Sequence, residues 1–143
     1  MLLRAIDVGA PAGSLFRWLC QLRVAPYSYD RIDNRGRRSP RTLTPGLEEL
    51  ETGQRFMQIF RLAEFEPGRS ITLVHSGPLF GRVVVTYEVT ATGPQASRLF
   101  ARLLVRYAHG PAAAALASLA LPAGDLVMMG RQLRTLRDRA EAT

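Results

Sequence analysis

The stretch AGDLVMMGRQLRTLRDRAE, residues 123–141, has the clearest helical periodicity in the sequence. Its apolar residues fall within an arc of about 80°, and its polar residues lie roughly opposite. The apolar arc comprises Leu126, Met129, Leu133, Leu136 and Ala140, and the polar arc comprises Arg131, Arg134, Asp138 and Arg139. This pattern predicts an amphipathic helix over 123–141 that packs its apolar side against another layer.

The rest of the sequence supplies strands for that layer. RVVVTYEVTA (82–91) and SRLFARLLVRYAH (97–109) are rich in alternating apolar residues and are separated by a turn containing glycine and proline, which predicts an antiparallel hairpin. LLRAIDV (2–8) and SITLVHS (70–76) also predict strands. QRFMQIFRLAEFE (54–66) is long enough for one bent strand or two short ones.

Strand residues of alternate parity project from opposite faces of a sheet. In the last strand, the face that carries Arg98, Arg102 and Arg106 also carries Phe100 and Leu104. The opposite face of the hairpin is apolar, and it carries Val83, Val85, Tyr87, Val89, Leu99, Leu103, Val105 and Tyr107. His75 shares the parity of Ile71 and Leu73 and is expected on an apolar face as well.

Two short helices are expected after the first strand. Pro11 suits the first turn of a helix, and the apolar residues after it fall on one face, with Arg17 and Gln21 opposite. That face carries Leu15, Phe16, Trp18, Leu19 and Leu22. A second short helix is plausible over 29–34, and a helical turn over 47–50.

This order of elements predicts an α+β fold in which the long helix covers one face of a curved antiparallel sheet. It resembles the helix-grip fold of the START-like (SRPBCC) superfamily, including its polyketide cyclase/dehydrase-like bacterial members. The segments that carry the resemblance are IDVGAPAGSLFRWLCQL (6–22), YSYDRIDN (27–34) and MMGRQLRTLRDRAE (128–141). The resemblance covers essentially the whole of residues 1–143 and therefore implies a single domain.

The resemblance implies a cavity between the sheet and the long helix, in which members hold lipids, sterols, polyketides or other apolar molecules. We therefore expect a monomer or homodimer that binds a hydrophobic or amphipathic small molecule there, without a cofactor. The expected ligand-binding residues are Trp18, Tyr27, Tyr29, Leu73, His75, Val85, Tyr87, Leu103, Val105, Tyr107, Met129 and Leu133. The strand region 54–109 is short, which predicts a missing or merged strand and a smaller or more open cavity.

An alternative hypothesis is an enzyme, because some members of the superfamily are enzymes. A cyclase or dehydratase in the same cavity would use Tyr29, Asp30 or His75 as acid and base. The segment YSYDRIDN has two interpretations. Its tyrosines would orient a ligand at the cavity mouth, or Tyr29 and Ile32 would pack a short helix while Asp30 supports its first turn. Tyr87 is likewise compatible with ligand contact or with an ordinary core hydrogen bond.

The charge of the chain suggests a third class of function. The formal net charge is +7, and all 19 basic residues are arginine. A basic surface favours contact with anionic ligands, lipid headgroups or nucleic acid. The densest cluster comprises Arg35, Arg37, Arg38 and Arg41. The third hypothesis is therefore a macromolecular-interaction protein that uses its arginine surface to bind RNA or an acidic partner. Aromatic residues do not interleave with the cluster and no nucleic-acid module is recognisable, which argues against nucleic acid.

Several site classes and compartments are excluded. A lone cysteine, Cys20, cannot form an internal disulfide and is expected to be a small buried residue. His75 and His109 lack metal-ligand spacing, so no metal site is expected. The longest apolar run, 112–121, is about half of what a bilayer crossing requires. The start of the chain lacks the apolar core of a secretory signal, which makes the cytoplasm the expected compartment.

Overall fold

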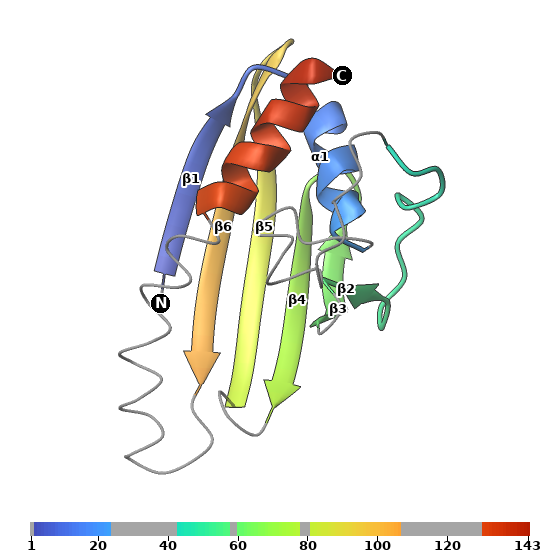
Figure 1. Cartoon of the computed structure of the whole chain (residues 1–143), viewed down its shortest axis with the longest axis vertical. Coiled ribbons are helices and arrows are strands. Elements are labelled where there is room, and N and C mark those ends of the chain that lie inside the picture. Colours follow the sequence, from blue (N-terminus) through green and yellow to red (C-terminus); the bar gives the residue numbers. More distant parts are fainter. Residues whose placement is uncertain (1, 24–42, 58–59, 78–80, 107–129) are drawn as a thin grey trace.

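The computed structural model describes residues 2–23, 43–57, 60–77, 81–106 and 130–143 (Figure 1). The elements follow the order β1 (Leu2–Val8), α1 (Ala12–Cys20), the 3₁₀ turn η1 (Gln21–Arg23), β2 (Arg55–Phe56), β3 (Phe60–Glu66), β4 (Ser70–Gly77), β5 (Gly81–Gly93) and β6 (Ala96–Arg106). Residues 130–142 are helical and are called the C-terminal helix below. The predicted start of that helix at 123 and the predicted helix 29–34 lie outside the described residues.

The strands form one antiparallel sheet of six strands in the order β1-β6-β5-β4-β3-β2. The predicted hairpin is β5–β6, and the first strand has the predicted bounds. The segment 54–66 divides into two strands, of which β2 has only two residues. A bulge between Leu62 and Glu64 shifts the register of β3, so Leu62 and Phe65 both turn toward the covered side although their separation is odd.

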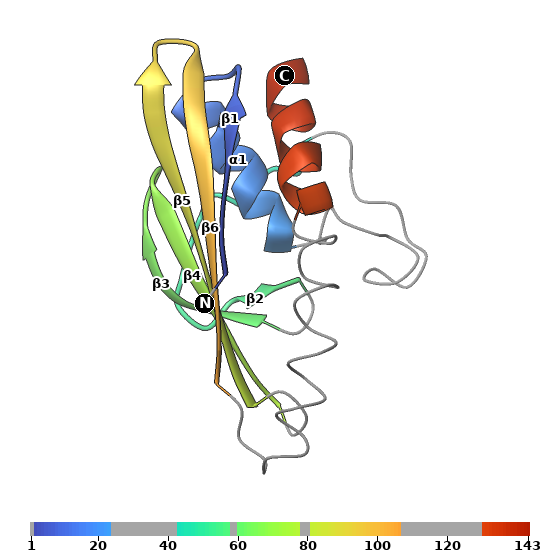
Figure 2. The same cartoon turned by 90° about the vertical axis from the view of Figure 1, so that its left-hand side faces the viewer.

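The C-terminal helix and α1 lie on the same face of the sheet, as Figure 2 shows. We call this the inner face and the opposite one the outer face. Apolar side chains that meet between the two layers are fully or almost fully buried, and they include Leu15, Leu19, Ile71, Leu73, Leu99, Leu133 and Leu136. Two leucines of the outer face, Leu3 and Leu104, are 57% and 46% exposed. The predicted α+β arrangement, with a helix over one face of the sheet, is confirmed.

Helix α1 follows the predicted pattern, with one correction. The predicted first helix divides into α1 and η1, and its five predicted apolar residues are buried, four in α1 and Leu22 in η1, whereas Arg17 is exposed. Gln21, which was expected opposite the apolar face, is also fully buried. Its side-chain oxygen accepts from the Thr44 N–H at 3.0 Å, and its amide donates to the Thr44 carbonyl at 3.4 Å. Burial is possible because both halves of the amide have a partner.

The segment before β2 also differs from expectation. Residues 45–48 form a turn in which the Glu49 N–H donates to the Gly46 carbonyl, rather than a helical turn over 47–50. Gly46 has a φ of +83°, which stops a right-handed helix at that point. None of the helices in the described ranges has the length and apolar character that a membrane crossing requires.

Candidate functional site at the inner face of the sheet

The strand register arranges the inner face in rows, because directly paired residues of antiparallel strands project from the same side. The first row, called the Tyr87 row, holds Arg4, Ala101, Tyr87, Ile71 and Phe65. The next, the Val85 row, includes Leu103, Val85, Leu73 and Leu62. The third, the Val83 row, includes Val83 and His75, and Val105 pairs with Val83 in register.

The C-terminal helix contacts the Tyr87 row through a buried polar link. The Tyr87 hydroxyl donates to Oε1 of Gln132, and Nε2 of Gln132 lies 3.2 Å from the sulfur of Met57. Both Tyr87 and Gln132 are at most 5% exposed. These contacts attach the start of the described helix to the middle of the sheet.

From Gln132 the helix runs toward the end of β1. There the Glu141 carboxylate accepts a hydrogen bond from the Gly9 N–H at 2.7 Å. Residues 130–142 therefore cover the Tyr87 row and the rows toward Val8. The helix runs from the Tyr87 row toward Val8. The Val85 and Val83 rows lie on the opposite side of the Tyr87 row.

Those two rows form an apolar surface with one imidazole at its margin. Leu103, Val85 and Leu73 are buried, and Val83 is 8% exposed. His75 and Phe60 are both half-buried, and their ring centroids lie 5.8 Å apart in a tilted arrangement. The two rows therefore have a mostly apolar composition with one polar group, His75, beside them, which is typical of the lining of small-molecule sites.

Met57 stands where β2, η1 and the C-terminal helix meet. Besides its sulfur contact with Gln132, its N–H donates to the Leu22 carbonyl at 2.7 Å. Its φ is +47°, in the left-handed region that side chains rarely adopt. Backbone strain of this kind persists where surrounding contacts hold it, and here both the backbone and the side chain are held.

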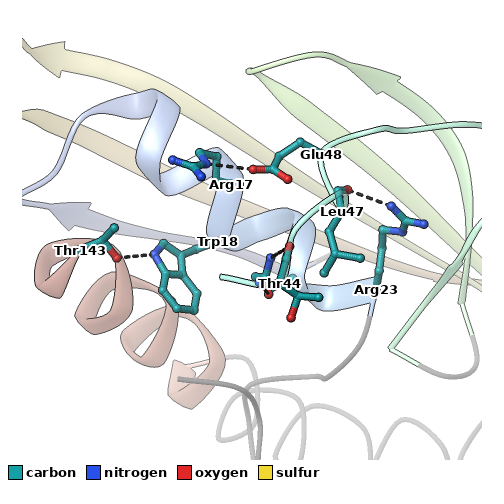
Figure 3. A network of polar contacts seen from close by, with 8 residues as sticks. Arg17, Trp18, Arg23, Thr44, Leu47, Glu48 and Thr143 are labelled. Atoms are coloured by element: carbon teal, nitrogen blue, oxygen red, sulfur yellow. Dashed lines mark hydrogen bonds and ion pairs between the residues drawn. The ribbon is translucent and has the colours of Figure 1, made fainter. Parts of the chain in front are cut away.

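Trp18 joins α1 to the C-terminal helix rather than lying in the two apolar rows. Its indole Nε1 donates to the Thr143 hydroxyl at 2.8 Å (Figure 3), and the side chain is only 2% exposed. The Thr143 hydroxyl in turn donates to the Arg139 carbonyl at 2.8 Å. A direct ligand contact by Trp18 stays a prediction.

Polar contacts also attach α1 and η1 to the segment before β2 (Figure 3). Arg17 Nε lies 2.9 Å from Glu48 Oε1, and Arg23 Nη1 donates to the Leu47 carbonyl at 3.0 Å. The hydrogen bond from Arg17 lowers the pKa of Glu48. Cys20 lies beside this network, and burial of its thiol raises its pKa to about 12. Such a thiol is a structural group rather than a nucleophile.

The structure distributes the predicted site residues unevenly. Leu73, His75, Val85, Tyr87 and Leu103 share the inner face, and Leu133 is buried on the helix above it. Tyr27, Tyr29, Asp30, Tyr107 and Met129 lie outside the described residues. The convergence of Tyr29, Asp30 and His75 that an enzyme would need therefore stays a prediction.

Three residues at or beside the inner face were missed from the sequence: Arg4 on the sheet, Met57 after β2 and Gln132 on the C-terminal helix. Arg4 shares strand parity with Ile6 and Val8, so alternation alone places it on the apolar side of β1. Gln132 lies one helical turn before Leu136, inside the apolar stripe. Strand parity for Arg4 and helical spacing for Gln132 both indicated the apolar side, but charged and polar residue types suggested solvent exposure.

Arg98 and Arg102 of β6 lie on the outer face, as their parity predicted. Arg98 and Arg102 are exposed, and Arg98 Nε lies 2.7 Å from Asp7 Oδ1. The cluster Arg35, Arg37, Arg38 and Arg41 lies outside the described residues. Among the ranges that the structure describes, no group of three histidine, cysteine, aspartate or glutamate residues is placed to hold a metal ion.

No family model matches the chain, and no curated protein matches it. Solved structures do. A START superfamily protein from Mycobacterium smegmatis aligns with a TM-score of 0.54 at 16% identity, over 99% of this chain and 97% of that one. The chain has a START-like, helix-grip fold. The predicted resemblance is confirmed at the level of fold.

Two further solved structures share this fold. CalC from Micromonospora echinospora, described as a self-sacrificing resistance protein, gives a TM-score of 0.60 at 12% identity, over 99% of this chain and 94% of that one. The di-domain ARO/CYC protein BexL, from the BE-7585A biosynthetic pathway, gives 0.58 at 15% identity, over 98% of this chain and 46% of that one. At these identities the likeness concerns the fold.

Proposed function

We propose that this START-like protein binds a hydrophobic or amphipathic small molecule against the Val85 and Val83 rows. The observation that carries the proposal is the composition of these rows. Leu103, Val85, Leu73 and Val83 present an apolar surface, and half-buried His75 supplies a polar group at its margin. A mostly apolar lining with few polar groups is typical of small-molecule sites.

The fold supports the same proposal. Its solved neighbours include a START superfamily protein and an ARO/CYC protein of a biosynthetic pathway. By analogy with these names, the ligand is lipid-, sterol- or polyketide-like. Affinity would come mainly from burial of apolar ligand surface. Covering about 200 Å² is worth roughly 5 kcal/mol at about 25 cal/mol per Å² before association costs are subtracted.

Methyl NMR tests the proposed location with an internal control. The inner-face methyls of Leu73, Val83, Val85 and Leu103 and the outer-face methyls of Val74, Val84 and Leu104 come from the same three strands, β4, β5 and β6. A panel of fatty acids, sterols and aromatic polyketides is titrated into the labelled protein. We expect at least one ligand class to shift the inner set and leave the outer set in place. Shifts confined to the outer set, or no shift with any compound, contradict the proposal.

We keep the enzyme as a second proposal because His75 lies on the inner face, two rows from the Tyr87 hydroxyl. A histidine beside an apolar ligand surface can act as acid or base near neutral pH. Turnover of an aromatic polyketide substrate that His75→Gln abolishes while binding persists would support catalysis. If the wild-type protein binds the substrate but does not convert it, the protein acts as a carrier and the enzyme proposal fails. In either case we propose one domain acting in the cytoplasm, as a monomer or homodimer.

A further inference from the structure

Arg4 is a cation on the covered side of the sheet. It pairs with Ala101 in register, and Ala101 pairs with Tyr87, so all three project from the inner face. Arg4 is half-buried, whereas its neighbours Leu3 and Ala5 are exposed on the outer face. The side chain is covered as far as its Nε atom, which is buried from solvent.

Within the part of the chain that the structure describes, the Nε of Arg4 has no hydrogen-bond partner. The strand carboxylates of the described residues cannot supply one, because their parity places them on the outer face: they are Asp7, Glu64, Glu66 and Glu88. The Glu141 carboxylate is engaged by the Gly9 N–H. A buried donor without a partner is costly and rare in folded proteins, and a missing ligand is one physical reason for it.

We propose that Arg4 anchors an anionic group of the bound molecule, so the ligand is an amphipath with a carboxylate or a similar oxyanion at one end. This inference rests on the proposed function and specifies its ligand class. A guanidinium presents a fixed fork of N–H donors that matches a carboxylate in two parallel hydrogen bonds. Its charge is kept at any physiological pH.

The register of the sheet places Arg4 next to the candidate ligand surface. Arg4 and Tyr87 stand two strands apart, which is roughly 10 Å, and only the methyl group of Ala101 lies between them in the row. The Val85 row, with Leu103 beside Ala101 on β6, is the adjacent row. An apolar body on the Val85 and Val83 rows would therefore have its polar end beside the Arg4 guanidinium, at the β1 edge of the Tyr87 row.

The test compares two ligands of equal chain length, laurate and dodecanol, by calorimetric titration of the full chain. We expect the wild-type protein to bind laurate about tenfold more tightly, the usual scale for a charge-assisted pair. Arg4→Gln should remove this preference and leave dodecanol affinity unchanged. Arg102→Gln is the matched control, because Arg102 pairs with Leu3 and lies exposed on the outer face. It should keep the preference.

The outcomes separate this inference from the proposed function. Equal affinity for both ligands in the wild-type protein, or an equal loss of both in Arg4→Gln, overturns the anchor while dodecanol binding still supports the apolar site. Failure of both ligands, with the inner-face methyls unshifted, overturns the site and the anchor together. If Arg4→Gln does not fold, the Nε–Hε resonance of Arg4 in the wild-type protein decides. It should shift with laurate and not with dodecanol.

Discussion

The Trp18 indole donates its N–H to the Thr143 hydroxyl across 125 residues of sequence, and this bond holds α1 beside the end of the C-terminal helix (Figure 3). The same helix is attached to β1 through Glu141 and Gly9, and to the sheet centre through Gln132 and Tyr87. Polar contacts at both ends thus position the apolar stripe of the helix. The candidate ligand surface, the Val85 and Val83 rows, lies next to the Tyr87 row, which Gln132 contacts.

The Trp18–Thr143 bond should contribute measurably to stability. Thr143→Val removes the acceptor and leaves a part-buried indole N–H without this partner, so we expect the free energy of unfolding to fall by about 1 kcal/mol. Thr143→Ser keeps the hydroxyl and serves as the control. Urea denaturation followed by far-ultraviolet circular dichroism measures both. Equal stability of Thr143→Val and wild type would show that the bond contributes nothing in solution.

The buried link between Tyr87 and Gln132 should cost more to break. Tyr87→Phe leaves the Gln132 carbonyl oxygen without its hydroxyl donor in a buried site, and we expect a loss of about 1–3 kcal/mol. Adding Gln132→Leu removes the Gln132 carbonyl oxygen, and it should restore part of the lost free energy of unfolding. The double-mutant cycle in urea measures the coupling. Additive losses from the two single substitutions would mean that these side chains are not coupled.

Much of this fold follows from local patterns. Alternation in 2–8 and in the β5–β6 hairpin, and the helical stripe ending at Ala140, depend only on residues a few positions apart. Local spacing puts Gln132 in the apolar stripe, but it does not predict that Gln21 and Gln132 can be buried, because their partners Thr44 and Tyr87 are 23 and 45 residues away. A glutamine is buried only when distant groups satisfy its amide, and the sequence of one element does not contain that information.

The inner face of the sheet shows the same limit for the candidate site. Parity placed Leu73, Val85 and Leu103 together because strand periodicity is short-range. The bulge after Leu62 broke parity in β3, and nothing in FRLAEFE marks it. Arg4 had the inner parity but the wrong chemistry for a core. Its place beside Ala101 and the Tyr87 row, which makes it a candidate for ligand binding, is given by the register of β1 against β6.

The ion pair of Glu48 with Arg17 should make the protein slightly less stable at acidic pH. Its pKa is lowered in the folded protein because Arg17 donates a hydrogen bond to the carboxylate. A lowered folded-state pKa means that the contribution is present above the unfolded value of 4.5 and is lost as pH falls below it. Because the pair is largely exposed, we expect no more than about 1 kcal/mol. Glu48→Gln should be less stable than wild type at pH 7, and the difference in stability should shrink as pH falls below 4.5. A constant difference across this range would contradict the assignment.

Cys20 should be inert in the folded protein and should make it sensitive to alkali. Burial disfavours the thiolate and raises the folded-state pKa from 9.0 to about 12. The folded state therefore holds this proton more tightly than the unfolded state, and stability is lost as pH rises from 9.0 toward about 12. Cys20→Ala, which lacks the group, should show a shallower decline over that interval in urea denaturation. At pH 8, a disulfide reagent such as 5,5′-dithiobis(2-nitrobenzoate) should react with Cys20 only after the protein is unfolded in guanidinium. Rapid, complete reaction of the native protein would mean that α1 does not seal this thiol from solvent.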